Sequence, residues 1–299
     1  MTKKVTKAII AAAGFGTRFL PQTKAMPKEM LPLIDKPIIQ YVVEELVEAG
    51  ITDIIIVGSS NKRSIEDHFD SPSEDLLANL KMGGPKKAHL LDMVEQVSQL
   101  ANFVYIRQKG PYGNGTPLLN AAHLIGDEPF IYTWSDDFIA ASPSRFRQLI
   151  ETYETYGCPV LAGIAATKDA DYARYGFAAG QEVADGLIQA EMIIEKPGST
   201  EAAHGGIATV SGFLLTSEVF PYLQQAQEQM QAGDELWYND ALKLMIADGK
   251  KILAARIKNG HYYDAGDKLE YLKTVIDFGL AHEELGSDLR AHLLKRLAD

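Results

Sequence analysis

A glycine-rich loop that carries two cations follows the first apolar run of the chain. The run at 7–12 leads into Gly14 and Gly16, and Arg18 and Lys28 follow in a segment interrupted by prolines. Glycines let a backbone approach a ligand closely, and the N–H groups of such a loop can hold phosphate oxygens. A guanidinium and an ammonium would offset the charge of a phosphate. These residue types indicate a site for a phosphorylated ligand.

The loop fits neither of the two most common nucleotide-binding motifs. Position 19 holds Phe19 instead of a third glycine, which excludes the dinucleotide fingerprint Gly-x-Gly-x-x-Gly. No Gly-Lys-Ser or Gly-Lys-Thr closes the loop, which excludes a Walker A motif. A plain tight turn would explain Gly-x-Gly alone, and solvation at the surface would explain either cation alone. Two cations in one loop after a strand favour the phosphate site.

Asp136 and Asp137 stand where an α/β sheet places its ligands. They follow an apolar run at 129–134, and open α/β sheets bind ligands at the carboxyl ends of their strands. Hard oxygen ligands of this kind suit Mg²⁺, which takes one or two carboxylates. A turn or a helix cap is the alternative role for this pair.

Apolar runs and helical periods alternate along the chain and would position these residues. Continuous apolar runs predict buried strands, and apolar residues spaced by three and four predict helices. The predicted strands are 7–12, 53–57, 103–107, 129–134, 160–166, 187–194, 207–215 and 251–257, and the predicted helices are 37–50, 116–125, 142–156, 267–282 and 287–297. The strand–helix–strand order predicts a parallel sheet with right-handed crossovers and a less regular second lobe. The helix-like segment 70–100, weakly broken at 83–85, has no predicted place.

Composition and charge exclude several classes of protein. The chain has 299 residues, of which 46% are hydrophobic, enough for a sizeable core and unlike a disordered chain. The formal net charge of −11 disfavours nucleic acids and anionic membranes as partners. A single cysteine, Cys158, excludes an intrachain disulfide, and no segment approaches the roughly 20 apolar residues of a membrane span. We expect a cytoplasmic protein without a nucleic-acid or membrane partner.

The glycine loop and its surroundings resemble the signature of the sugar-1-phosphate nucleotidylyltransferase family. The matching stretches are Ala-Ala-Gly-x-Gly-Thr-Arg-Phe-x-Pro at 12–21, Lys24, Pro-Lys-Glu-Met-Leu-Pro at 27–32 and Lys-Arg-Ser-Ile-Glu-Asp-His-Phe-Asp at 62–70. The similarity covers about residues 5–282 and is densest in the first 70. It is greatest to the bacterial members of the family that use UTP and glucose 1-phosphate.

The resemblance implies a fold and a division of the chain. The fold would be α/β, with a Rossmann-like, mixed and mostly parallel sheet flanked by helices, a smaller sugar-binding lobe and C-terminal helices. A nucleotidylyltransferase domain would span 1–282, with a nucleotide-binding part at about 1–140 and a sugar-phosphate-binding part at about 141–266. The C-terminal helices at 267–299 could serve a homodimer or homotetramer, as in related enzymes.

The resemblance also implies a reaction. MgUTP and α-D-glucose 1-phosphate would give UDP-glucose and pyrophosphate, by attack of a sugar-phosphate oxygen on the α-phosphorus of UTP. The second pKa of a phosphate monoester lies near ~6, so the nucleophile is mostly dianionic at neutral pH and needs no general base. What the reaction needs is cations and a metal to bring the anions together and to stabilise the leaving group.

The family pattern assigns roles to particular residues of this chain. Arg18, Lys28 and Asp136 would be catalytic, and Asp136 and Asp264 would hold Mg²⁺. The nucleotide-binding residues would be Ala12, Ala13, Gly14, Gly16, Glu29, Gln108 and Gly113, and the sugar-phosphate-binding residues would be Tyr175, Gly176, Glu195 and Lys196. The amide of Gln108 complements uracil and rejects cytosine, but it cannot separate UTP from dTTP, because thymine presents the same edge.

Three departures from the family pattern lie near the implied site. They are Gly-Asn-Gly-Thr-Pro at 113–117, Trp-Ser before Asp136, and Trp-Tyr-Asn at 237–239 in place of the usual Gln-Leu-Thr. They leave two alternatives open. The same chemistry could use dTTP or another sugar 1-phosphate, or the chain could be a catalytically weak paralogue that binds a sugar nucleotide and regulates a true enzyme.

Overall fold

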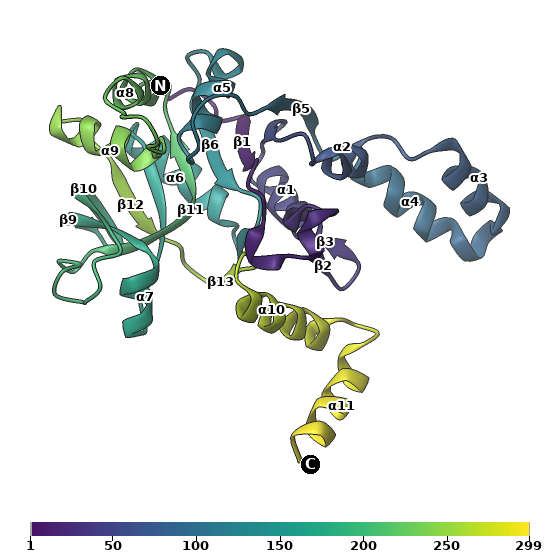
Figure 1. The fold of residues 1–299 in the computed structure, drawn as a ribbon. Helices are drawn as coiled ribbons and strands as arrows, with labels where there is room; N and C mark the ends of the chain where they lie inside the picture. Colours follow the sequence, from purple (N-terminus) through teal and green to yellow (C-terminus); the bar gives the residue numbers. More distant parts are fainter. Residues whose placement is uncertain (1, 299) are drawn as a thin grey trace.

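A mixed sheet of nine strands forms the centre of the computed structural model, which describes residues 2–298 (Figure 1). The strand order is β5-β4-β1-β6-β11-β8-β12-β10-β9. The strands are β1 (Lys7–Ala12), β4 (Asp53–Gly58), β5 (Asn102–Arg107), β6 (Phe130–Trp134), β8 (Val160–Ile164), β9 (Gly176–Ala184), β10 (Leu187–Glu195), β11 (Ile207–Leu215) and β12 (Leu253–Arg256). Within this sheet only β10 and β11 run against the other strands. The expectation of a mixed, mostly parallel sheet is confirmed.

Strand β11 joins the two halves of the sheet. Its last residues pair with β6, where Phe213 lies opposite Tyr132, while its first residues pair with β9, where Thr209 lies opposite Gly176. The register against β8 shifts between Thr209 and Phe213. Gly212 lies in this shift with φ +99°, a left-handed conformation that glycine adopts without strain. The pairings of β8, β12, β10, β9 and β11 therefore close a ring, which is the second lobe.

Helices cover both faces of the sheet because successive strand residues point to opposite sides. On one face Ile10 and Ile54 pack in a core with the helices α1 (Ile38–Glu48) and α6 (Arg145–Tyr156). On the other face Ile9 and Ile55 pack in a second core with α5 (Thr116–Ile125), α8 (Val219–Glu228) and α9 (Tyr238–Ala247). Helix α1 is buried along residues spaced by three and four, from Ile39 to Leu46, as its apolar period predicts.

Two helical segments extend from this body (Figure 1). One lies beyond β5 and holds α2 (Arg63–Phe69), α3 (Glu74–Met82) and α4 (Ala88–Val97), and the break between α3 and α4 falls at the expected glycines. The other is the C-terminal pair α10 (Lys268–Ala281) and α11 (Gly286–Ala298), of which α11 points away from the sheet. The smaller elements are α7 (Asp169–Arg174), the ribbons β2 (Pro32–Leu33) with β3 (Lys36–Pro37) and β7 (Asp137–Ala141) with β13 (Gly260–Asp264), and the 3₁₀ turns η1 (Thr17–Phe19), η2 (Gln22–Lys24), η3 (Lys28–Met30) and η4 (Gly84–Lys87).

The structure corrects some of the predicted elements. The helix expected from residue 142 begins at Arg145, because the side chain of Ser144 caps it by accepting from the N–H of Arg147. The strands β7, β9 and β13 are not predicted at all. Strand β7 is short, although its residues 138–141 are apolar, and β9 and β13 lack a continuous apolar run along their length, because half of β9 is exposed and every residue of β13 is exposed or only partly buried. Within residues 2–298, no helix has the length and apolar character to cross a membrane.

Candidate active site

A cavity of about 450 Å³ opens where the parallel strands β1, β4, β5 and β6 end. Its lining residues are Ala11, Ala13, Gly14, Phe15, Lys28, Glu29, Ser59, Gln108, Gly110, Tyr112, Gly113, Asn114, Pro117 and Trp134. This set includes Lys28 and most of the residues predicted to bind nucleotide. Ala12 and Gly16 lie in the same loop but outside the lining. The glycine loop and the loop after β5 thus meet over one cavity, as the sequence predicts.

Gly113 has a steric reason to be glycine. Its φ is +116°, and a Cβ at this position would lie 2.1 Å from the carbonyl oxygen of Leu236. The chain runs so close here because Leu236 exchanges backbone hydrogen bonds with this loop, donating to the carbonyl of Tyr112 and accepting from Gly115. The segment before α9 therefore supports the loop that lines the cavity.

The residues that depart from the family pattern support one another on one wall of the cavity. The ring of Trp134 packs 5.6 Å from the ring of Tyr238 and 5.4 Å from that of Phe213. The side chain of Asn114 accepts a 3.0 Å hydrogen bond from the backbone N–H of Tyr238. Ser135 is buried and donates to the carbonyl of Ala11 at 3.0 Å. The departures therefore form packing contacts and leave the cavity open.

A buried ion pair lies beneath the glycine loop. The ammonium of Lys62 lies 3.0 and 2.8 Å from the two carboxylate oxygens of Glu29, and it also donates to the carbonyl of Gly14 at 2.6 Å. The side chain of Glu29 is fully buried and that of Lys62 nearly so. Burial raises the pKa of Glu29, and the nearby cations Lys62 and Lys28 oppose this shift. Lys62 thereby ties the glycine loop to the loop that carries Lys28 and Glu29.

The two acids predicted to hold a metal converge at Gly266. Strand β13 pairs with β7 so that Asp264 lies opposite Asp137, the neighbour of Asp136. A Cβ placed on Gly266 would lie 2.6 Å from Oδ2 of Asp136 and 3.1 Å from Oδ1 of Asp264. The glycine therefore leaves a cradle that two carboxylate oxygens face, and its own N–H donates to Oδ1 of Asp264 at 3.0 Å. Hard oxygen donors on an open cradle suit Mg²⁺, which keeps several waters.

Three cations surround this pair of acids. The ammonium of Lys28 pairs with Asp136, and the guanidinium of Arg18 donates to the carbonyl of Gly266 at 3.1 Å. The guanidinium of Arg174 pairs with Asp264. Burial alone would lower the pKa of Lys28, but the nearby carboxylates, chiefly that of Asp136, outweigh burial and raise it. Lys28 is therefore a fixed positive charge at the end of the nucleotide cavity.

A buried network holds the residue next to Asp136. The carboxylate of Asp137 accepts from Ser211 and, at 3.0 Å, from the hydroxyl of Tyr262. The guanidinium of Arg145, which is fully buried, lies 3.7 Å from Asp137 and 3.0 Å from Glu45. Burial raises the pKa of Asp137 to about 6, and Arg145 opposes the shift. This network fixes the start of β7 from behind.

The predicted sugar-phosphate residues lie together on two neighbouring strands. Gly176 begins β9 directly opposite Glu195, which ends β10, and the N–H of Lys196 donates to the carbonyl of Tyr175 at 3.2 Å. A Cβ on Gly176 would come within 3.0 Å of Oε2 of Glu195, so glycine keeps this carboxylate accessible. Asn239 at the start of α9 donates to the same oxygen at 3.1 Å. The carboxylate is thus oriented from behind with its other oxygen available.

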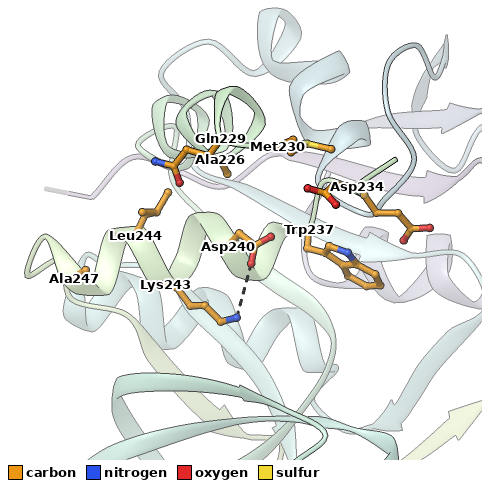
Figure 2. Close-up of a pocket in the computed structure, with 10 residues that line it drawn as sticks. Ala226, Gln229, Met230, Asp234, Trp237, Asp240, Lys243, Leu244 and Ala247 are labelled. Atoms are coloured by element: carbon orange, nitrogen blue, oxygen red, sulfur yellow. Dashed lines mark ion pairs between the residues drawn. The ribbon is translucent and has the colours of Figure 1, made fainter. Parts of the chain in front are cut away.

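A second cavity, of about 650 Å³, lies apart from these residues (Figure 2). It is a groove between α8 and α9 with acidic residues on its wall, and Asp240 there pairs with Lys243 at 3.8 Å. None of the residues predicted for catalysis or substrate binding lines it. The cavity at the strand ends is therefore the candidate active site.

The family model described as Nucleotidyl transferase matches residues 7–277 of the chain. The chain belongs to the nucleotidyl transferase family. Members of this family generally use a divalent metal ion. The resemblance to this family that the sequence shows is therefore confirmed.

Similar members of the family carry consistent names. The UTP–glucose-1-phosphate uridylyltransferase YngB of Bacillus subtilis (strain 168) is 43% identical over 293 residues, which are 98% of this chain and 96% of that protein. A UTP–glucose-1-phosphate uridylyltransferase of Staphylococcus epidermidis is 41% identical over 97% of this chain and 98% of its own length.

Solved structures of the family have the same fold. A UDP-glucose pyrophosphorylase in complex with UDP-glucose matches with a TM-score of 0.80 at 33% identity, covering 92% of this chain and 98% of that one. A UTP-bound UGPase from Acinetobacter baumannii matches with a TM-score of 0.83 at 30% identity, covering 97% and 99%. The predicted Rossmann-like fold of this family is confirmed.

Sequence reasoning missed three polar residues of the site. In the sequence Lys62 stands out only as part of a family motif, and no pattern indicates a role for Arg174 or Asn239. Each contacts a predicted site residue far away in the sequence: Glu29 for Lys62, Asp264 for Arg174 and Glu195 for Asn239. The one available signal was position, because Arg174 directly precedes Tyr175-Gly176 and Asn239 lies within a segment that departs from the family.

Proposed function

We propose that this nucleotidyl transferase moves a uridylyl group from UTP to α-D-glucose 1-phosphate, giving UDP-glucose and pyrophosphate. One observation carries the proposal. Arg18, Lys28, Asp136 and Asp264 converge at Gly266, at the end of a cavity that the glycine loop and Gln108 line. A site with cations and two carboxylates beside a nucleotide-sized cavity suits phosphoryl transfer between polyanions. The names of the similar proteins support UTP and glucose 1-phosphate as the substrates.

The chain's own residues lower the electrostatic barrier of the reaction. The sugar phosphate attacks the α-phosphorus of UTP as a dianion, so no side chain has to remove a proton. Lys28 and Arg18 offset the charge of the triphosphate and of the departing pyrophosphate. Mg²⁺, which Asp136 and Asp264 would hold, supplies further positive charge on the phosphates when it is bound.

The two lobes divide substrate recognition. The nucleotide-binding part, about 1–140, holds the base and triphosphate through Ala12, Ala13, Gly14, Gly16, Gln108 and Gly113. Glu29, whose carboxylate is buried against Lys62, supports the glycine loop through that ion pair. In the sugar-phosphate-binding part, about 141–266, Glu195 accepts from sugar hydroxyls and Lys196 offsets the sugar's phosphate, beside the backbone of Tyr175 and Gly176. The helices at 267–299 complete the chain.

The decisive experiment measures pyrophosphate release by the purified chain with Mg²⁺. Four nucleotides (UTP, dTTP, CTP and ATP) are each combined with glucose 1-phosphate, galactose 1-phosphate and an N-acetylated hexosamine 1-phosphate. We expect the highest kcat/KM for UTP with glucose 1-phosphate. A higher value for dTTP or another sugar would replace the substrate assignment. If no combination gives product, the chain is a regulatory paralogue and not an active enzyme.

Two variants test the site within the same assay. Lys28→Ala and Asp136→Asn should each lower kcat by orders of magnitude and leave the far-ultraviolet circular dichroism spectrum unchanged. Lys81→Ala is the matched control, because Lys81 is an exposed lysine on α3, outside the family signature and the cavity lining. Near-normal turnover of Asp136→Asn would refute the metal assignment.

We further propose a cytoplasmic homodimer or homotetramer in which the C-terminal helices contact a second copy. Leu269, Leu272 and Ile276 of α10 and Leu294 and Leu297 of α11 are exposed. Apolar side chains on a projecting helix support burial against another chain. Analytical ultracentrifugation of wild type and of Leu294→Glu/Leu297→Glu tests this proposal. We expect wild type to sediment as an oligomer and the double variant as a monomer, and a monomeric wild type would contradict the proposal. Cell fractionation tests the location.

A further inference from the structure

Arg174 reaches from the sugar-phosphate lobe to a proposed metal ligand. It is the last residue of α7, and its guanidinium pairs with Oδ2 of Asp264. A second nitrogen of the guanidinium lies 4.0 Å from Glu270. The side chain of Arg174 is 34% exposed and that of Asp264 21% exposed. The contact is therefore partly exposed to water.

Each proposed metal ligand faces one cation of the protein. Lys28 occupies Oδ2 of Asp136, and Arg174 occupies Oδ2 of Asp264, whose Oδ1 faces the cradle at Gly266. A divalent ion bound to these acids would stand within a few ångströms of the guanidinium, and like charges at that distance repel. Metal binding therefore weakens the attraction that holds Arg174 on Asp264.

The residue that follows Arg174 belongs to the proposed sugar-phosphate site. The carbonyl of Tyr175 accepts from the N–H of Lys196, and Gly176 lies opposite Glu195. A guanidinium released from Asp264 is thus carried by the same segment that borders the sugar phosphate. Its planar pair of N–H groups suits phosphate oxygens better than a single ammonium does.

We propose that Arg174 holds Asp264 until the metal binds and then exchanges this carboxylate for the phosphate of the sugar 1-phosphate. The proposal rests on the proposed function, because it requires the metal at Asp136 and Asp264. It makes Arg174 a second cation at the sugar's phosphate, beside Lys196. Metal and sugar phosphate would then bind in a coupled manner, since each favours the same position of one side chain.

The sign of the effect on metal affinity separates this role from a purely structural one. A guanidinium that competes with the metal for Asp264 weakens metal binding, so its removal should tighten binding. A guanidinium that only braces Asp264 improves metal binding, so its removal should loosen binding. A partly exposed ion pair changes affinity by about two- to fivefold, which is measurable.

The experiment uses the full chain, Mn²⁺ as the probe and electron paramagnetic resonance of free Mn²⁺ as the readout, without substrates. We expect Arg174→Gln to bind Mn²⁺ about two- to fivefold more tightly than wild type. Loss of a charge-assisted contact to phosphate should also raise the KM for glucose 1-phosphate roughly tenfold or more, with the KM for UTP little changed. Arg174→Lys should fall between Arg174→Gln and wild type.

The controls make the outcome decisive. Arg63→Gln removes an exposed arginine that pairs with Asp67 away from the site, and it should leave both readouts unchanged. Unchanged or weaker Mn²⁺ binding by Arg174→Gln, or an unchanged KM for glucose 1-phosphate, would overturn the proposal. Asp264→Asn tests the metal site itself, because wild-type Mn²⁺ binding by that variant would refute the metal assignment whatever Arg174 does.

Discussion

Asp264 on β13 lies directly opposite Asp137 on β7 in the antiparallel pairing of these two strands. Because Asp136 immediately precedes β7, this register brings Asp136 and Asp264 to the same point, where both approach Gly266. Two acids from distant parts of the sequence can therefore act together only if a short ribbon keeps its register. A shift by one residue would turn one carboxylate to the other face.

Gly266→Ala should abolish most activity without unfolding the protein. The added Cβ would lie 2.6 Å from Oδ2 of Asp136 and 3.1 Å from Oδ1 of Asp264, so at least one carboxylate has to move. A displacement near 1 Å at a reacting centre can cost about 10²-fold in rate. We expect kcat to fall by about that factor, measured by pyrophosphate release. A thermal unfolding midpoint near that of wild type is the control, and unchanged turnover would contradict the cradle.

The sequence predicted those parts of the molecule that depend on local signals. The strands from 7–12 to 129–134 are continuous apolar runs, and the glycine loop places its cations within a few residues of each other. The ribbon of β7 and β13 has only a weak signal of this kind, because β7 is short, β13 is partly exposed, and the two strands pair across more than a hundred residues. Lys62 and Arg174 were missed for the same reason, since a single polar residue does not reveal a distant partner.

Lys62→Met should destabilise the protein more than the same substitution of an exposed lysine does. The substitution leaves the carboxylate of Glu29 fully buried without its partner, and breaking a buried pair costs about 3–5 kcal/mol. Urea unfolding followed by circular dichroism measures the change in the free energy of unfolding. Lys62→Met/Glu29→Leu should recover much of this loss but little turnover, because the carbonyl of Gly14 still lacks its donor. Lys250→Met, which removes an exposed ion pair with Glu218, is the matched control.

Stability should fall as the pH rises through the titration of Glu45. Burial raises the pKa of this carboxyl from 4.5 to about 7, although Arg145 opposes the shift. Within residues 2–298 neither oxygen of Glu45 accepts a well-aligned hydrogen bond. Between about pH 4.5 and 7 the unfolded chain therefore binds fewer protons than the folded protein, so the free energy of unfolding decreases with rising pH.

The measurement compares urea unfolding at pH 5 and pH 8 for wild type and Glu45→Gln. Wild type should lose on the order of 2 kcal/mol more than the variant over this interval, because the amide does not titrate. Glu44→Gln, which alters the partly buried partner of Lys36 on the same helix, should keep the wild-type dependence. An equal loss in wild type and Glu45→Gln would show that Glu45 is ionised throughout.

Asn239→Asp should weaken binding of the sugar phosphate and spare the nucleotide. Asn239 is buried and donates to Oε2 of Glu195 at 3.1 Å, which orients this carboxylate toward the space that Gly176 leaves open. A carboxylate at position 239 cannot donate and places like charge beside Glu195. Because the acceptor Glu195 is itself exposed, water replaces part of the lost hydrogen bond, and we expect a cost of about 0.5–1.5 kcal/mol, which corresponds to a KM for glucose 1-phosphate raised about two- to tenfold. Asn239→Thr keeps a hydrogen-bond donor, so its KM for glucose 1-phosphate should lie between those of wild type and Asn239→Asp. An equal rise in the KM for UTP would show that Asn239 supports the whole site instead of the sugar carboxylate.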